Sequence, residues 1–413
     1  MTHARRPLLL VTPIMPAAAG NGLAMRAGLA LAALAETHEV HLCVVPVSDP
    51  APDITPFVAA HAARIRVLDL VPDAHAALIG RVIDPAERLR HRRGYARPWL
   101  ARFCTKAAYD VLAAWAGGTE YASVQVNGLH LAPFADAVAA RVRVLDLNDD
   151  EIRTRESLAA VHARNGDATQ SELERAEADA YRRFAAHWFP RFDCVLTAAR
   201  ADAIRLQAEY QGTFTELANG YDPILPKPKP AYGRFHVLFV GTLGYPPNTD
   251  AARFLCRDIF PHLHDRAHLD IAGPGAPPDL QRLANKQAIT LHGMVPDLAP
   301  LYATAAVAAV PIRAGGGTRI KILEAFAHRV PVVSTSVGAE GLDVMPGRDF
   351  LCADGAQAFA AACCRVAADH GLAANLRDAG TALLRRRYAA INVRRDLRRI
   401  HAALTEAKQA ART

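Results

Sequence analysis

Short apolar runs alternate with helical patterns along the first half of the chain. The runs have the length and composition of buried strands, and they cover residues 8–11, 40–45, 65–70, 123–126, 142–147 and 194–198. Between some of these runs lie segments whose apolar residues recur with helical spacing, at 23–35 and at about 169–184. Because parallel strands are joined by long crossovers, usually helices, this alternation predicts βαβ units and a parallel sheet.

A proline-rich segment, 223–233, interrupts this pattern. Its four prolines do not fit a helix interior or a central strand, so it reads as a linker. The alternation then resumes, with apolar runs at 236–240, 269–272, 289–291, 307–311, 330–334 and 350–351 and a helix at 249–259. We therefore expect a Rossmann-like domain at 1–224, a second at 225–378 and a terminal helix at 379–413. Ligands are expected in a cleft at the carboxyl ends of the strands.

Composition agrees with a two-domain α/β protein. The 413 residues suit two domains of ordinary size, and half of them are apolar. The formal net charge of +7 favours phosphate-bearing partners or anionic lipid. No nucleic-acid motif accompanies the basic residues, so we expect no nucleic-acid partner.

Cysteine usage and hydropathy favour the cytoplasm. The seven cysteines include no Cys-x-x-Cys pair, so neither a disulfide framework nor a structural zinc site is expected, and we predict no bound metal. No apolar stretch is long and uncharged enough to span a bilayer. The first apolar run ends at Pro13 and is predicted to be a strand rather than part of a signal peptide.

The most informative segment is 315–342, GGGTRIKILEAFAHRVPVVSTSVGAEGL. It reads as a glycine loop, a helix, a buried strand and a second glycine loop. The glycines let the backbone approach a ligand, and Thr318 can cap the helix. Arg319 and Lys321 lie in the first helical turn, where the helix dipole and added cations favour phosphate. Glu324 lies among apolar residues, where a carboxylate is costly unless it is paired; sugar or ribose hydroxyls would serve.

This segment resembles the donor-site signature of the retaining, family-4 glycosyltransferases. That signature has two glutamates eight positions apart; Glu324 matches the second, and Gly316 stands at the first. The resemblance implies a GT-B fold, in which two doubly wound Rossmann-like domains face a central cleft and the terminal helix crosses back to the first domain. It assigns Glu324 to the ribose of the nucleotide and the first position to the donor sugar. The alternative is an ordinary helix–strand crossover with a solvated Glu324.

Further loops resemble other donor-site elements of the family. Glycine loops follow the first strand of each half, and in the family such loops lie against the donor diphosphate. The usual basic residue after Gly241 is missing, so Arg319 and Lys321 are expected to stabilise the leaving diphosphate. The expected donor contacts are Gly20, Gly22, Gly241, Thr242, Gly273, Gly293, Val295, Gly316, Gly317, Thr318 and Glu324.

On the expected acceptor side, acids and amides gather after the run at 142–147, in VLDLNDDEIRTRES. Side chains at the carboxyl end of a strand are placed to contact ligand hydroxyls, whereas a capped helix start explains the same acids without a ligand. We name Asp149 as a catalytic candidate beside Arg319 and Lys321. The acceptor-binding candidates are Arg26, Asn127, His130 and Asn148, with Asn127 standing where some relatives place a histidine.

The resemblance implies a retaining, hexosyltransferase-type glycosyltransferase. It would move a sugar from a nucleotide-diphosphate sugar to a hydroxyl of a glycan or lipid-linked acceptor, as in polysaccharide biosynthesis. The nucleotide sugar is the donor substrate, and no separate cofactor is expected. Two alternatives stay open: a sugar-nucleotide 2-epimerase on the same fold, and a non-catalytic nucleotide-sugar-binding protein, which Gly316 in place of an acid suggests.

Two arginine-rich segments, 81–106 and 385–399, add a further expectation. The first also contains Trp99 and Phe103. A solvated helix face is the ordinary explanation of such segments. A basic segment with aromatic residues also suits an anionic membrane surface, which would make this a cytoplasmic protein that is peripheral on the inner face of the membrane.

Overall fold

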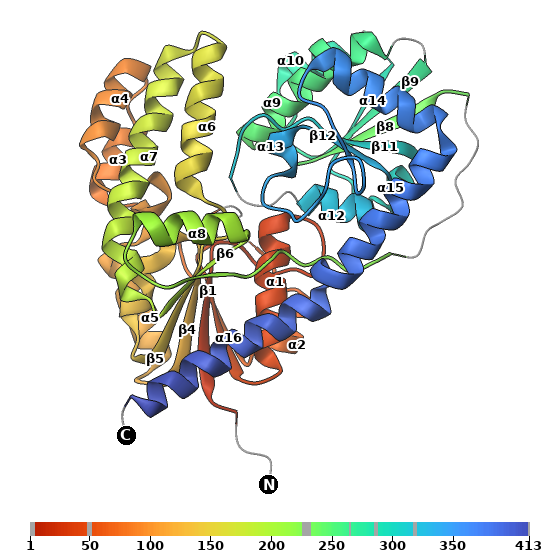
Figure 1. Cartoon of the computed structure of the whole chain (residues 1–413). Coiled ribbons are helices and arrows are strands. Elements are labelled where there is room, and N and C mark those ends of the chain that lie inside the picture. Colours follow the sequence, from red (N-terminus) through yellow and green to blue (C-terminus); the bar gives the residue numbers. More distant parts are fainter. Residues whose placement is uncertain are drawn as a thin grey trace. The chain divides into compact units, whose positions relative to one another are not determined.

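The computed structural model describes residues 5–47, 52–224, 233–263, 266–284, 288–316 and 320–411 (Figure 1). The chain divides into unit 1, Met1–Ala218 with Asn392–Thr413, and unit 2, Asn219–Ile391. The first division thus falls after Ala218 rather than after 224, and the second after Ile391 rather than after 378. Most of the proline-rich linker expected at 223–233 lies outside the described residues.

Unit 1 is built on a parallel sheet in the order β3-β2-β1-β4-β5-β6-β7. On β1, Leu9 belongs to one hydrophobic core, whereas Leu8 and Leu10 belong to another. A sheet that is buried on both faces needs continuous apolar strands, which is the pattern of the sequence. The strands are β1 Pro7–Thr12, β2 Glu39–Val44, β3 Arg64–Val67, β4 Tyr121–Asn127, β5 Ala140–Asp146, β6 Cys194–Thr197 and β7 Phe214–Glu216.

Helices cover both faces of this sheet (Figure 1). The C-terminal helix α16, Ala390–Ala410, belongs to unit 1 from Asn392 onward, and its Val393 and Leu397 join the core that contains Leu8 and Leu10. The other helices are α1 Gly22–Ala35, α2 Pro56–His61, α3 Ala74–Gly80, α4 Pro85–Gly94, α5 Lys106–Ala116, α6 Glu151–Arg164, α7 Ala168–Trp188 and α8 Arg200–Glu209, with 3₁₀ segments η1 Trp99–Phe103, η2 Leu129–Ala137 and η3 Phe189–Arg191.

Unit 2 holds a second parallel sheet, in the order β10-β9-β8-β11-β12-β13, so the prediction of two parallel α/β halves is confirmed. The strands are β8 Phe235–Val240, β9 Ala267–Ala272, β10 Ile289–Gly293, β11 Ala305–Val310, β12 Val332–Ser334 and β13 Leu351–Cys352. The helices are α9 Pro246–Phe254, α10 Pro278–Ala284, α11 Ala299–Thr304, α12 Ile320–Ala327, α13 Ser336–Ala339, α14 Ala356–Ala368 and α15 His370–Leu383. None of the described helices has the length and apolar character needed to cross a bilayer.

The terminal helix expected at 379–413 is interrupted rather than continuous. After α15 the chain makes a π-helical turn, Leu384–Tyr388, and Ala389 then adopts an extended conformation with ψ of 135°. Tertiary contacts account for the break. The buried Tyr388 accepts a hydrogen bond from the Asp343 backbone N–H, and Asp222 accepts one from the N–H of Ala390, which caps the new helix.

Candidate functional site

In unit 2, glycine loops meet at the carboxyl ends of β8, β9 and β10. The N–H of Gly241 donates to the carbonyl of Ala272, and the N–H of Gly273 donates to the carbonyl of Gly293. A Cβ at Gly273 would lie 1.9 Å from the carbonyl oxygen of Gly241, and Gly273 has φ of +144°, so no other residue fits there. Three of the expected donor contacts therefore form one surface of main chain.

Lys321 stands beside this surface, in the first described turn of α12. Its Nζ donates to Asn248 Oδ1 at 2.6 Å and lies 4.7 Å from the ring centroid of Phe239. Asn248 in turn donates to the carbonyl of Thr242 at 3.0 Å, and its amide packs against Gly241. Asn248 thus holds a cation next to the loop after β8.

Of the predicted residues around this helix start, Gly317, Thr318 and Arg319 lie outside the described residues. Gly316, which takes the place of the family's first glutamate, is buried. Val295 lies just beyond the end of β10, in the loop that Gly293 begins.

Arg313, which the sequence analysis missed, fixes the loop that leads from β11 to α12. Its guanidinium makes two hydrogen bonds to the buried carboxylate of Asp250, at 2.6 and 3.0 Å, and lies 4.4 Å from the ring centroid of Phe254. The paired geometry is the one in which arginine binds carboxylate most specifically. The signal in the sequence was a cation three residues after a buried strand, which a local pattern does not connect to Asp250.

Both carboxylate oxygens of Glu324 accept hydrogen bonds from tyrosines. Tyr221 donates to Oε1 at 2.9 Å and Tyr302 to Oε2 at 3.0 Å. Tyr302 is buried and stacks on His328, with ring centroids 4.2 Å apart. Burial raises the pKa of Glu324, and the tyrosine bonds and Lys321 only partly offset that rise. The Glu324 carboxylate is therefore paired within the protein, as its apolar surroundings require. Its remaining oxygen lone pairs can still accept hydrogen bonds from a ligand.

In unit 1, the acceptor-binding candidate Arg26 is engaged in a buried ion pair. Its Nε lies 2.9 and 3.0 Å from the two carboxylate oxygens of Asp146, and its Nη2 donates to the carbonyl of Leu217. The side chains of Arg26 and Asp146 are only 4% and 0% exposed. This pair ties α1 to the carboxyl end of β5, and the backbone N–H of Asn148 also donates to Asp146.

Unpartnered polar atoms gather where β4 and β5 end. Asn127 Nδ2, both ring nitrogens of His130 and Asn148 Oδ1 are buried without a hydrogen-bond partner among the described residues. Gly128, with φ of +93°, donates its N–H to the carbonyl of Asp146 and leaves room for the His130 ring, which would lie 2.7 Å from a Cβ there. Native proteins satisfy nearly all buried polar atoms, so these atoms mark a place where further hydrogen bonds can form.

The remaining candidates of unit 1 are more exposed. Asp149 follows Asn148, which has a left-handed φ of 60°, and its N–H donates to the carbonyl of Leu147 at 2.7 Å. Gly20, with φ of +101°, belongs to an exposed loop before α1, and no atom would block a Cβ there. Gly22 is the first residue of α1, capped by Asn21.

His130 predicts a pH dependence of stability. Burial, then Arg155 and Arg102, lower its pKa from 6.5 to about 4. Between these values the unfolded chain binds more protons, so the stabilisation is complete above pH 6.5 and is lost as the pH falls toward 4. The loss between pH 7 and 5 is at most about 2 kcal/mol. His130→Gln should reduce the pH dependence of unfolding followed by tryptophan fluorescence, which reports unit 1 because Trp99, Trp115 and Trp188 all lie there. Identical slopes for wild type and variant would contradict this.

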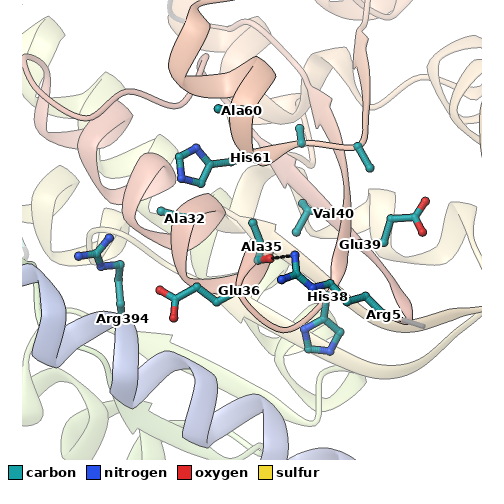
Figure 2. A pocket seen from close by; sticks show the side chains of 12 residues that line it. Arg5, Ala32, Ala35, Glu36, His38, Glu39, Val40, Ala60, His61 and Arg394 are labelled. Atoms are coloured by element: carbon teal, nitrogen blue, oxygen red, sulfur yellow. Dashed lines mark hydrogen bonds between the residues drawn. The ribbon is translucent and has the colours of Figure 1, made fainter. Parts of the chain in front are cut away.

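A cavity of about 650 Å³ lies in unit 1 (Figure 2). Its lining comes from the starts of β1 and β2, the ends of α1 and α2, and α16, with Arg5, Glu36, His38, His61 and Arg394 among the polar residues. These are the amino ends of the strands, whereas Asn127 and Asp146 are at the carboxyl ends of β4 and β5. The cavity is therefore separate from the candidate residues of unit 1.

Comparisons with known proteins agree with this arrangement. Residues 234–369 match the family model for glycosyl transferases group 1, whereas no curated protein matches the chain in sequence. Sucrose-phosphate synthase from Thermosynechococcus elongatus is a similar solved structure, with 17% identity, a TM-score of 0.66 and coverage of 98% of this chain and 100% of that chain. HepE from Anabaena, in complex with UDP and glucose, has 15% identity, a TM-score of 0.64 and coverage of 96% and 100%.

A third similar structure is α,α-trehalose 6-phosphate synthase from Burkholderia multivorans, with 14% identity, a TM-score of 0.63 and coverage of 100% of this chain and 99% of that chain. Identities this low show the fold alone. The predicted GT-B fold, with two Rossmann-like domains, is thereby confirmed, and the group 1 pattern is confirmed for residues 234–369.

Proposed function

We propose that this protein is a glycosyltransferase, because residues 234–369 carry the group 1 glycosyltransferase pattern. It takes a nucleotide-diphosphate sugar and transfers the sugar, with retention at the anomeric carbon, to a hydroxyl of a glycan or lipid-linked acceptor. The start of α12 carries the proposal: Lys321 is held beside the glycine loops, and Glu324 follows on the same face of the helix. The similar HepE structure, which contains UDP and glucose, supports this donor class.

In the reaction, the bond between the anomeric carbon and a diphosphate oxygen breaks, and a bond to the acceptor oxygen forms. The proton of the acceptor hydroxyl passes to the departing diphosphate, on which negative charge develops. Lys321 would stabilise that charge, with Arg319 as a second cation, while Glu324 accepts from ribose hydroxyls. A cation that is already held in position needs no reorganisation during the step.

The acceptor would be held by unit 1. Asn127 Nδ2 can donate, Asn148 Oδ1 can accept, and neutral His130 can do both. Hydroxyl-rich ligands supply the partners that these buried atoms lack among the described residues. We propose that Asp149, beside Asn148, accepts a hydrogen bond from the acceptor hydroxyl and so orients it before its proton passes to the diphosphate.

A panel of nucleotide sugars separates this proposal from the alternatives. Thermal shift first identifies the donor, because a ligand that binds only the native state raises its melting temperature. Acceptor-dependent release of nucleoside diphosphate supports transfer. An isomerised nucleotide sugar would instead establish a 2-epimerase, and binding without turnover of any donor would establish a non-catalytic nucleotide-sugar-binding protein.

Lys321→Ala should lower turnover by roughly 10²-fold, as expected for loss of a preorganised electrostatic group. Its effect on binding of the bare nucleoside should be much smaller, because the proposed contact is to the diphosphate. Steady-state kinetics and calorimetric titration measure the two effects. Lys106→Ala is the control, since Lys106 is exposed and pairs with Asp110 on α5. Wild-type turnover in Lys321→Ala would place the diphosphate elsewhere.

For the proposed membrane contact, we infer other residues than Trp99 and Arg92. Trp99 and Arg92 are engaged internally: Arg92 pairs with Glu177 and lies 4.2 Å from the Trp99 ring centroid, and the backbone N–H of Trp99 donates to Glu177 Oε1 at 2.6 Å. Leu78 of α3 and Ile83 before α4, by contrast, are 62% and 89% exposed. Exposed Arg81 and Arg90 lie close to them in the chain. We propose that the segment 78–90, through exposed Leu78, Arg81, Ile83 and Arg90, contacts anionic lipid on the cytoplasmic face.

The double variant Leu78→Ser/Ile83→Ser should lose most binding to vesicles of phosphatidylglycerol and phosphatidylcholine in a sedimentation assay. Arg81→Glu/Arg90→Glu should weaken binding at low salt, because each basic residue contributes about 1 kcal/mol near such a surface. Ile204→Ser is the control, since Ile204 is 63% exposed on α8. If all these proteins sediment equally, the surface is an ordinary solvated face.

A further inference from the structure

A buried chain of polar side chains runs along β4. Ser123, Gln125 and Asn127 alternate along the strand with Val124 and Val126, so they share the face opposite those valines. All three are 0–1% exposed. Apolar residues would be expected on this buried face, so three polar ones need partners.

The partner comes from the C-terminal helix α16, which runs across the unit 1 sheet (Figure 1). His401 of α16 is buried, with Nε2 at 2.9 Å from Gln125 Oε1 and Nδ1 at 3.2 Å from Ser123 Oγ. Gln125 Nε2 then donates to Asn127 Oδ1 at 3.2 Å. The chain ends at Asn127 Nδ2, which has no partner among the described residues.

These contacts define one direction of donation. Gln125 Oε1 can only accept, so His401 must carry its proton on Nε2, and its Nδ1 accepts from the Ser123 hydroxyl. Gln125 Nε2 then donates to Asn127 Oδ1, so this oxygen already accepts a hydrogen bond within the protein. The amide group left at the carboxyl end of β4 is therefore an N–H donor and not a carbonyl acceptor. Burial lowers the pKa of His401 to about 3, which keeps the ring neutral and able to accept at Nδ1.

We propose that His401 is a positioning residue that acts through Gln125 to present Asn127 Nδ2–H to an oxygen atom of the sugar substrate. The inference rests on the proposed function for the identity of the ligand, but the direction of donation is a property of the free protein. His401 itself touches no substrate. Its contribution is to fix an amide that would otherwise rotate between donor and acceptor forms.

The first test needs no activity. In the full-length protein labelled with ¹⁵N-histidine, a long-range ¹H–¹⁵N spectrum should show His401 as the neutral Nε2–H tautomer at pH 7 and still at pH 5. The signals that disappear in His401→Gln identify the residue. An Nδ1–H tautomer would reverse the donation, leave a carbonyl at Asn127 and overturn the proposal. Protonation of His401 above pH 5 would overturn it equally.

The second test is kinetic, with the donor found by thermal shift. His401→Leu and Gln125→Leu should lower kcat at least tenfold while the affinity of unit 2 for the nucleoside diphosphate stays within twofold. His401→Gln keeps an N–H donor toward Gln125 and should recover most of the loss. Gln125→Glu offers no donor to Asn127 and should resemble Gln125→Leu. Thr405→Ala, which removes a hydrogen bond to the His401 carbonyl on the same helix, is the control for altered helix stability and should keep wild-type kcat.

The two tests fail in different ways. Wild-type kcat in folded His401→Leu, or a His401→Gln variant as impaired as His401→Leu, overturns the positioning role. If the wild-type protein turns over no nucleotide sugar, the proposed function fails, and the tautomer spectrum alone then decides whether the chain donates toward Asn127.

Discussion

Asp146→Ala is expected to destabilise unit 1 by about 3–5 kcal/mol, the cost of leaving one member of a buried ion pair without its partner. The Arg26 guanidinium, in a residue only 5% exposed, would be left without the Asp146 carboxylate. The Asn148 N–H would lose its acceptor as well. Urea unfolding followed by tryptophan fluorescence measures the effect, since all three tryptophans lie in unit 1.

Two variants show whether the loss of the ion pair causes the destabilisation of unit 1. Arg26→Met/Asp146→Leu removes both charges and should be less destabilised than Asp146→Ala, because no unpaired charge remains. Glu120→Ala removes the partner of Arg141 in an exposed pair and should change stability by less than about 1 kcal/mol. If Asp146→Ala is as stable as Glu120→Ala, the buried pair contributes little to the stability of unit 1.

Glu324→Ala should both weaken donor binding and destabilise unit 2. The hydroxyls of Tyr221 and Tyr302 each lose their acceptor, at about 1–3 kcal/mol for each buried group left unpaired. Separately, a ribose hydrogen bond to the charged carboxylate contributes about 1.5–3 kcal/mol to donor binding, so its loss should lower donor affinity at least tenfold. Calorimetric titration gives the affinity, and scanning calorimetry gives the stability, because unit 2 has no tryptophan.

Glu324→Gln separates the two roles. A glutamine can accept from one tyrosine and donate to the other, so the fold should be largely kept while the charged acceptor is lost. Asp378→Asn is the control, since Asp378 is an exposed acid of unit 2 that pairs with Arg329. Glu324→Gln with wild-type donor affinity would leave Glu324 as a structural anchor for the two tyrosines and remove it from the nucleotide site.

The parallel sheets could be predicted from the chain itself. A strand buried on both faces must be apolar along its whole length, and a crossover helix must have one apolar face, so both leave local patterns. The start of α12 could also be predicted from the local sequence, because Lys321 and Glu324 are unusual within an apolar helix of eight described residues. Arg319, Thr318 and Gly317 stay predictions, since they lie outside the described residues.

The partners of the polar side chains could not be predicted in this way. Arg26 meets Asp146 across 120 positions, Glu324 meets Tyr221 across 103, and His401 meets Gln125 across 276. The break at Ala389 likewise depends on Asp222. The sequence alone indicated the strands of both sheets except β7, because burial leaves a periodic signal within about ten residues. Only the tertiary structure decided which polar groups are satisfied within the protein and which lack a partner among the described residues, because strand order and helix packing bring together residues that no local pattern relates.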